Sequence, residues 1–170
     1  MNFEKLLSGG DLRKTGNVNQ VIGLVNNQAN FDQLLKLLFH TDRSIIMRAA
    51  DAIEKITRTK PVYLRKHKSS ILQLCDKAHD KELKWHLALL IPRFTLSISE
   101  TEKVWALLMH WAMQKNESKI VRVNSVQGLF NLLPQNAALT GDFNLLLKTL
   151  EAENIPSLNA RIKRLRGIQF

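Results

Sequence analysis

Cysteine is almost absent from this 170-residue sequence, which contains only Cys75. A single cysteine excludes an internal disulfide and a zinc site built on several cysteines. Long apolar runs are also absent, and the acidic Glu4 stands among the first residues. These absences predict neither a signal peptide nor a membrane-spanning segment. We therefore expect a cytoplasmic protein that does not insert into membranes.

Acidic residues are scarce, with 15 Asp and Glu against 25 Lys and Arg, which gives a net charge of +10. This excess of positive charge favours an anionic partner, such as nucleic acid, an acidic protein surface or an anionic membrane. Hydrophobic residues make up 45% of the chain, which indicates a folded protein and not a disordered one. The length is sufficient for one domain with a core.

Sequence motifs for catalysis are missing as well. The five histidines form no HExxH pair, and the glycine-rich stretch 9–16 lacks the GxxxxGK(S/T) spacing of a phosphate loop. Glu100, Glu102 and Glu117 show no pairing suited to acid–base chemistry. Cys75 lies on an apolar helical face, where core packing is expected. We predict no catalytic residue, no metal site and no small-molecule cofactor.

The sequence does contain a repeated amphipathic helix, which is clearest from Asp42 to Ile56. Its apolar side chains recur at the spacing of one helix face. They are Ile45, Ala49, Ala52, Ile53 and Ile56. Copies of this stripe follow after 38, 38 and 37 residues, at Leu83, Leu87, Leu90, Ile91 and Phe94, at Val121, Ser125, Gly128, Leu129 and Leu132, and at Leu158, Ile162, Leu165, Arg166 and Gln169. The last copy becomes polar at its end, as is typical of a terminal repeat.

Each copy is preceded by another apolar helical stretch, which predicts a helix–turn–helix unit of 37–38 residues. Asn or Asp stands before each second helix as a predicted N-cap, at Asp42, Asp80, Asn116 and Asn154. The predicted repeats cover residues 30–59, 68–94, 101–133 and 142–168. Residues 1–29 are expected to form a loop and a capping helix. The prediction is a single all-α domain over residues 1–170.

The repeated residues resemble the second helix of a HEAT repeat. Asp42–Ile56 carries the pattern best, and 80–88 and 119–123 carry it in part. The resemblance implies an armadillo-like α–α superhelix, similar to small bacterial HEAT-repeat proteins, with the second helices along a concave face. It implies nothing specific about function.

One position of the pattern departs from the family. Lys84 and Arg122 supply its basic residue, but the first repeat has Ile46 there. If this residue pairs with an acid of a neighbouring repeat, the first repeat is atypical, and the helix near 17–27 is expected to pack there as a cap.

Polar residues beside the stripe form two columns that lie on one side of the second helices. The columns contain Arg48, His86, Asn124 and Arg161, and then Lys55, Arg93 and Asn131. A third position beside them holds Asp51, Leu89, Gln127 and Arg164. One interpretation is a surface for an anion, and the other is a set of bonds that holds the repeats in register. Asp51 and Glu54 weaken the positive field, and Pro92 is expected to end or kink its helix.

Other features leave similar alternatives open. Met47 and Trp85 form a candidate apolar groove, or they are buried between helices. The basic runs 55–68 and 161–166 are candidate anion-binding patches, or they are solvated faces.

We therefore predict a non-enzymatic scaffold that binds a protein partner, which is expected to be acidic, along its concave face. The alternative is binding of nucleic acid, in particular DNA. Similarity to HEAT-like DNA glycosylases is limited to architecture, because their catalytic acid and aromatic clamp find no counterpart here. A HEAT-type lyase is a weaker alternative, since the columns offer only Asp51 and Trp85 for chemistry.

Overall fold

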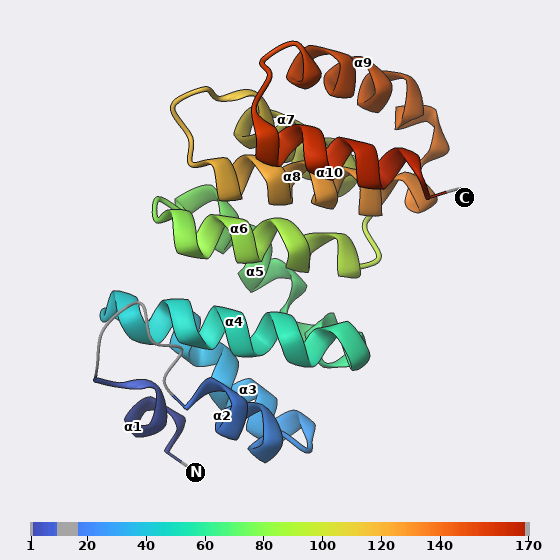
Figure 1. The fold of residues 1–170 in the computed structure, drawn as a ribbon. Coiled ribbons are helices and arrows are strands. Elements are labelled where there is room, and N and C mark those ends of the chain that lie inside the picture. Colours follow the sequence, from blue (N-terminus) through green and yellow to red (C-terminus); the bar gives the residue numbers. More distant parts are fainter. Residues whose placement is uncertain (1, 10–16, 169–170) are drawn as a thin grey trace. The chain divides into compact units, whose positions relative to one another are not determined.

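The computed structural model describes residues 2–9 and 17–168, and throughout this part the chain is helical and contains no strand (Figure 1). This confirms the predicted all-α class. The chain divides into two compact units, Met1–Ala78 (unit 1) and His79–Phe170 (unit 2). Of the predicted loop 9–16, only Gly9 lies within the described residues.

Unit 1 is built around its longest helix, α4 (Figure 1). Its elements are α1 (Phe3–Leu7), α2 (Val18–Leu24), α3 (Gln28–Lys36), η1 (Leu37–Phe39), α4 (Arg43–Thr59), η2 (Pro61–His67) and α5 (Lys68–Lys77), where η denotes a 3₁₀ helix. Helices α1, α2 and α3 all pack against α4. The expected packing of the helix near 17–27 on the first repeated helix is therefore confirmed.

Helix α4 forms for the reasons that the sequence suggests. Asp42 caps its first turn, with Oδ1 accepting a hydrogen bond from the Ser44 amide at 2.7 Å. All five residues of the predicted stripe are buried, and each large aliphatic among them contributes about 1.5–3 kcal/mol by leaving water. The helix ends at Thr59, just before Lys60 and Pro61, because the residue before a proline disfavours helical geometry.

Unit 2 is built around α8, which packs against α6, α7 and α10. Its elements are α6 (Lys81–Leu90), η3 (Ile91–Arg93), α7 (Ile98–Met113), α8 (Lys119–Leu132), η4 (Leu133–Gln135), η5 (Ala137–Leu139), α9 (Thr140–Glu151) and α10 (Pro156–Arg166). Helix α6 ends before Pro92, as predicted. Helix α8 approaches α6 closely at Gly128, where an added Cβ would lie 2.4 Å from the carbonyl oxygen of Ala88.

Two of the four predicted N-caps are wrong. Ser118, not Asn116, caps α8, and its side chain accepts from the Val121 amide. Asn154 lies in the turn before α10 with φ of 54°, a left-handed conformation that asparagine tolerates better than most residues. Helix α10 instead begins with Pro156, which lacks the amide hydrogen that a cap would satisfy. Asp80 occupies the N-cap position of α6 without a side-chain capping bond.

The division into units cuts through one predicted repeat. Helix α5 belongs to unit 1 and α6 to unit 2, so the two helices of the predicted repeat 68–94 lie in different units. None of the helices described is both long enough and apolar enough to cross a membrane.

Candidate functional site

Arg48, the first residue of the predicted column, is buried in unit 1, with 1% of its surface exposed. Its Nη1 donates hydrogen bonds to the carbonyl oxygens of Leu7 at 2.6 Å and Gly9 at 2.5 Å. Leu7 is the last residue of α1, so the guanidinium fixes the end of this helix against α4. Arg48 has a structural role in unit 1 and offers no surface to a partner.

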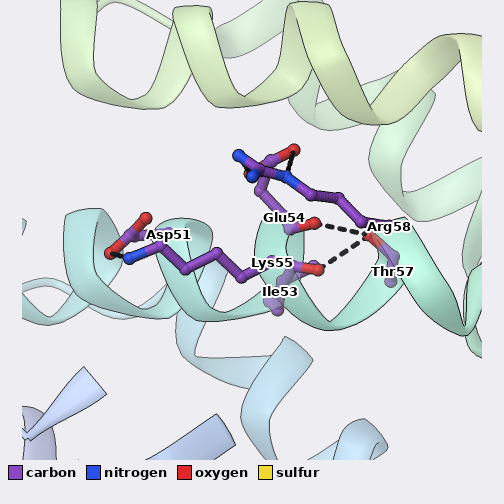
Figure 2. Close-up of polar contacts among 6 residues, drawn as sticks. All are labelled: Asp51, Ile53, Glu54, Lys55, Thr57 and Arg58. Carbon is purple, nitrogen blue, oxygen red and sulfur yellow. Dashed lines mark hydrogen bonds and ion pairs between the residues drawn. The ribbon is translucent and has the colours of Figure 1, made fainter. Parts of the chain in front are cut away.

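Four charged residues in the second half of α4 form two ion pairs, each one turn apart (Figure 2). Lys55, a member of the second column, pairs with Asp51 at 2.8 Å, and Arg58 pairs with Glu54 at 2.6 Å. Figure 2 also shows the Thr57 hydroxyl donating to the backbone oxygens of Ile53 and Glu54. The predicted weakening of the positive field by Asp51 and Glu54 is therefore confirmed.

Several predicted site residues of unit 2 are also turned inward. His86 and Asn124 have 1% and 8% of their surface exposed, and Asn124 Nδ2 donates to the Ile120 carbonyl of its own helix at 2.9 Å. Arg93 lies half-buried in η3. The two residues of the candidate apolar groove are both half-buried, but Met47 belongs to unit 1 and Trp85 to unit 2. Neither unit alone contains that groove.

Two residues of the predicted columns, Arg161 and Asn131, remain accessible where α8 and α10 pack together. Arg161 on α10 donates from Nη1 to Gln127 Oε1 on α8 at 2.8 Å, and Gln127 Nε2 donates to Asn131 Oδ1 at 2.9 Å. Arg161 is half-buried, whereas Arg164, one turn further along α10, is exposed. We call Gln127, Asn131, Arg161 and Arg164 the α8–α10 patch.

Arg161 has an unusual electrostatic environment for an arginine. Partial burial of Arg161, and then the neighbouring charge of Arg164, lower the pKa of the Arg161 guanidinium below its usual range. Among the residues that the structure describes, no carboxylate forms an ion pair with either arginine. A guanidinium held by a neutral amide beside a second guanidinium favours a bound anion.

The other cations in this part of the molecule contrast with Arg161. Lys84 on α6 pairs at 2.5 Å with Glu117, which lies in the turn before α8. Arg122 on α8 pairs at 2.8 Å with Glu153, which lies in the turn before α10. The sequence raised the condition that this basic residue pairs with an acid further along the chain, and Lys84 and Arg122 both form such a pair. The hydrogen bond from Arg122 lowers the pKa of Glu153 against the opposing effect of burial.

The sequence analysis missed a polar cluster in unit 1 centred on Asp32. This carboxylate accepts hydrogen bonds from Gln28 at 2.8 Å, from Lys66 and from the His67 ring at 2.7 Å. Burial would raise the pKa of Asp32, but these hydrogen bonds outweigh it and lower the pKa to about 2. The cluster joins α3 to η2, so Lys66 and His67 of the basic run 55–68 already have a partner.

Two residues of the α8–α10 patch also lay outside the predicted site. Gln127 and Arg164 occupy the third position beside the columns, and no feature of the sequence singles them out there. The spacing could have identified the contact between Gln127 and Arg161, because the two residues are 34 positions apart, close to the length of the predicted repeat.

The groups in the described residues are suited to binding and offer little for chemistry. Burial raises the pKa of the Cys75 thiol to about 12, so the nucleophilic thiolate does not form near neutral pH. In the same part of the chain, no three His, Cys, Asp or Glu residues are grouped so as to hold a metal ion. The α8–α10 patch presents hydrogen-bond donors and positive charge.

Comparisons with known proteins do not assign the chain to a family. No family model matches it, and searches of curated proteins and of solved structures found no match. The α8–α10 patch is therefore the feature of the molecule that points most directly to a function.

Proposed function

We propose that the chain is a non-enzymatic binding module that holds a carboxylate-rich segment of a protein partner on the α8–α10 patch. The observation that carries this proposal is the half-buried Arg161, which is bonded to the neutral Gln127 and lies next to Arg164. A carboxylate placed between the two guanidinium groups would offset their repulsion. It would also accept charge-assisted hydrogen bonds, which are stronger than bonds between neutral groups.

A HEAT-like solenoid remains part of the proposal. It is supported by the positions at which the second helices begin, since α4, α6, α8 and α10 start at residues 43, 81, 119 and 156. These starts keep the predicted spacing of 38, 38 and 37 residues. Repeats of this length, each with one helix pair, are typical of the HEAT and armadillo class.

The observations favour an acidic protein segment over nucleic acid. A phosphate backbone is usually bound by a row of several cations, each contacting a phosphate. In unit 2, Lys84, Arg122 and Arg166 are each paired with a glutamate, and the α8–α10 patch itself offers two guanidinium groups and not a row. Planar guanidinium groups bind carboxylate and phosphate alike, so the small extent of the patch is what favours a single carboxylate.

The direct test is the affinity of the full chain for a labelled peptide rich in Asp and Glu, measured by fluorescence anisotropy at low salt. Replacing Arg164→Gln should weaken binding by about tenfold, because a hydrogen bond to a charged group contributes about 1.5–3 kcal/mol. Arg161→Gln should have a similar or larger effect, with circular dichroism confirming that the variant is folded.

Lys163→Gln is the matched control. It removes one exposed positive charge from the same helix, but Lys163 lies about 200° around α10 from Arg161. We expect this variant to change the affinity by less than about threefold, since Lys163 cannot reach the bound carboxylate and contributes only a longer-range charge that water attenuates. Equal losses in Lys163→Gln and Arg164→Gln would show that only net charge matters, and would reject the patch.

Nucleic acid is the second candidate, because the net charge is +10 and Lys60 and Arg65 are exposed on unit 1. A duplex DNA of random sequence is the second arm of the same titration. Binding of DNA but not of peptide, with an affinity that falls steeply with salt, would replace our proposal by this one. No binding of either probe at low salt would reject both.

A further inference from the structure

We propose that the acidic segment also inserts an apolar side chain into a cavity where α8, α9 and α10 meet, so that the partner motif is acidic and apolar together. This inference rests on the proposed function. The cavity has a volume of about 270 Å³. Its apolar lining comes from Phe130 on α8 and Leu133 just after this helix, Phe143 and Leu147 on α9, and Leu165 on α10 with Ile168 just after it.

The cavity has a buried floor and an apolar edge. Phe130 and Phe143 have 8% and 3% of their surface exposed, and their ring centroids lie 6.0 Å apart. Ile168, in contrast, is 46% exposed. Its amide donates to the Leu165 carbonyl at 3.1 Å, which places Ile168 directly after the last turn of α10. A partner side chain entering here would cover Ile168 and contact the two rings.

The cavity is large enough for one apolar side chain, and it opens on the surface beside α10. At about 270 Å³ it is close to the smallest sites of drug-sized ligands and cofactors, which usually measure about 300–1,000 Å³. An apolar anchor in a pocket is also a common source of affinity at protein interfaces.

The charge around the cavity selects an acidic partner. Helix α10 contains no acidic residue, and its Arg161 and Arg164, on the side of the α8–α10 patch, form no ion pair with a described carboxylate. Arg166 lines the cavity itself and is held there by Glu151 at 2.6 Å. A peptide with its apolar residue in the cavity must therefore lie against a positively charged helix. Acidic residues beside the anchor would be attracted there, and basic residues repelled.

The spacing between the two parts of the site predicts the spacing in the motif. Arg161 and Ile168 are seven residues apart, about 10 Å along the helix axis. An extended peptide covers this distance in about three residues. We therefore expect the apolar anchor to stand about three residues from the carboxylate that binds the patch.

The experiment compares two labelled peptides on the full chain. Both are rich in Asp and Glu, and they differ only in a Phe or a Ser placed three residues from the central acid. Burial of the Phe side chain should make the first peptide bind at least about tenfold more tightly. Ile168→Ser should reduce this ratio by several-fold. Ile120→Ser, which alters an equally exposed isoleucine on α8, should preserve it.

Methyl NMR provides a second readout that does not depend on a variant. The methyl signals of Leu147 and Ile168 should shift with the Phe peptide and much less with the Ser peptide. Leu145, which is 65% exposed on α9 and does not line this cavity, should remain unchanged with both. Shifts confined to other apolar residues would overturn the inference.

The possible outcomes distinguish a failure of this inference from a failure of the proposed function. If both peptides bind equally and Arg164→Gln weakens both, the cavity is not used, although the proposed function stands. If the Phe peptide binds and Arg164→Gln has no effect, the site is apolar only, and both the acidic motif and the proposed function fail. A chain dimer that Ile168→Ser dissociates would assign the cavity to a second copy and would also overturn the inference.

Discussion

The residues Ser125 and Gly128 interrupt the apolar stripe of the third repeated helix, yet both are buried on α8. Their small size lets α8 approach α6, and Gly128 lies against the backbone of Ala88. The sequence predicted that both residues belong to the buried face. It could not predict how closely the helices approach, because that distance depends on residues of the partner helix.

Replacing Gly128→Ala should destabilise the protein by about 1–3 kcal/mol. The new methyl group would lie 2.4 Å from a backbone oxygen that cannot move without shifting α6. This cost should exceed the gain of up to about 1 kcal/mol that alanine brings to a helix. Urea denaturation followed by circular dichroism measures the change.

Gly141→Ala on α9 is the control, since no atom lies within 4 Å of a Cβ added there. It should be neutral or slightly stabilising. A Gly128→Ala variant as stable as this control would show that α6 and α8 are less tightly packed than described.

Arg48 and Arg161 show the limit of sequence reasoning at this scale. Both occupy the same offset in their repeats, so the pattern treated them alike. Arg48 is surrounded by backbone carbonyls of residues far away in the sequence, whereas Arg161 meets only an amide side chain. Which of the two arginines can bind a partner depends on the groups around it in the fold, and the length of the repeat does not determine those groups.

At the scale of elements, Asp32 joins α3 to η2, a contact that no pattern in the sequence indicates. The partners lie 34 and 35 residues away in a stretch that was interpreted only as a basic run. The α4 pairs, in contrast, follow the spacing of four residues that any helix predicts.

Replacing Asp32→Asn should loosen η2 and lower the free energy of unfolding by about 1 kcal/mol at neutral pH, since the carboxylate is partly exposed. The pKa of Asp32 is lowered to about 2 in the folded state, below its ordinary value of 3.8. Its contribution to stability is therefore complete above about pH 5 and is lost as the pH falls towards 2.

The difference in unfolding free energy between the natural chain and Asp32→Asn should shrink between pH 5 and pH 2, as measured by urea titrations at each pH. Asp142→Asn, on the exposed start of α9, serves as the control. A difference that stays constant with pH would show that Asp32 is not ionically bonded in the folded protein.

The pair of Arg122 and Glu153 connects α8 to the turn before α10. Glu153→Gln should cost about 3 kcal/mol, because it leaves the guanidinium of Arg122, which is 2% exposed, without its counter-charge. The double variant Arg122→Met with Glu153→Gln should recover much of that loss, since it removes the buried charge. A double variant less stable than Glu153→Gln would contradict this account of the pair.

At the scale of the whole molecule, the division at Ala78 and His79 should be visible in local stability. Compact units commonly open separately in the native state. In hydrogen exchange, Gly128→Ala should reduce the protection of amides in unit 2 and leave those of unit 1 unchanged. Equal loss of protection throughout the chain would indicate one cooperative body instead.

The helical class and most helices from residue 17 onward could be predicted from the sequence, whereas helix α1 (Phe3–Leu7) was not. They follow from apolar spacing, prolines and short-range caps, which act locally. The division into units could not be predicted, because the repeat continues without interruption across residue 78. The candidate site was predicted only in part, since burial of Arg48, His86 and Asn124 depends on packing between elements.

The contact between Arg122 and Glu153 also has a consequence for synthesis on the ribosome. A nascent chain that ends before residue 153 contains all of α8 but lacks the carboxylate that neutralises Arg122. In such a chain the guanidinium retains only the Ala112 carbonyl, at 2.8 Å, as its partner from the preceding helix. Helix α8 should therefore pack stably only after the turn before α10 has left the exit tunnel. Folding of unit 2 should then wait for the synthesis of its last helix pair, α9 and α10.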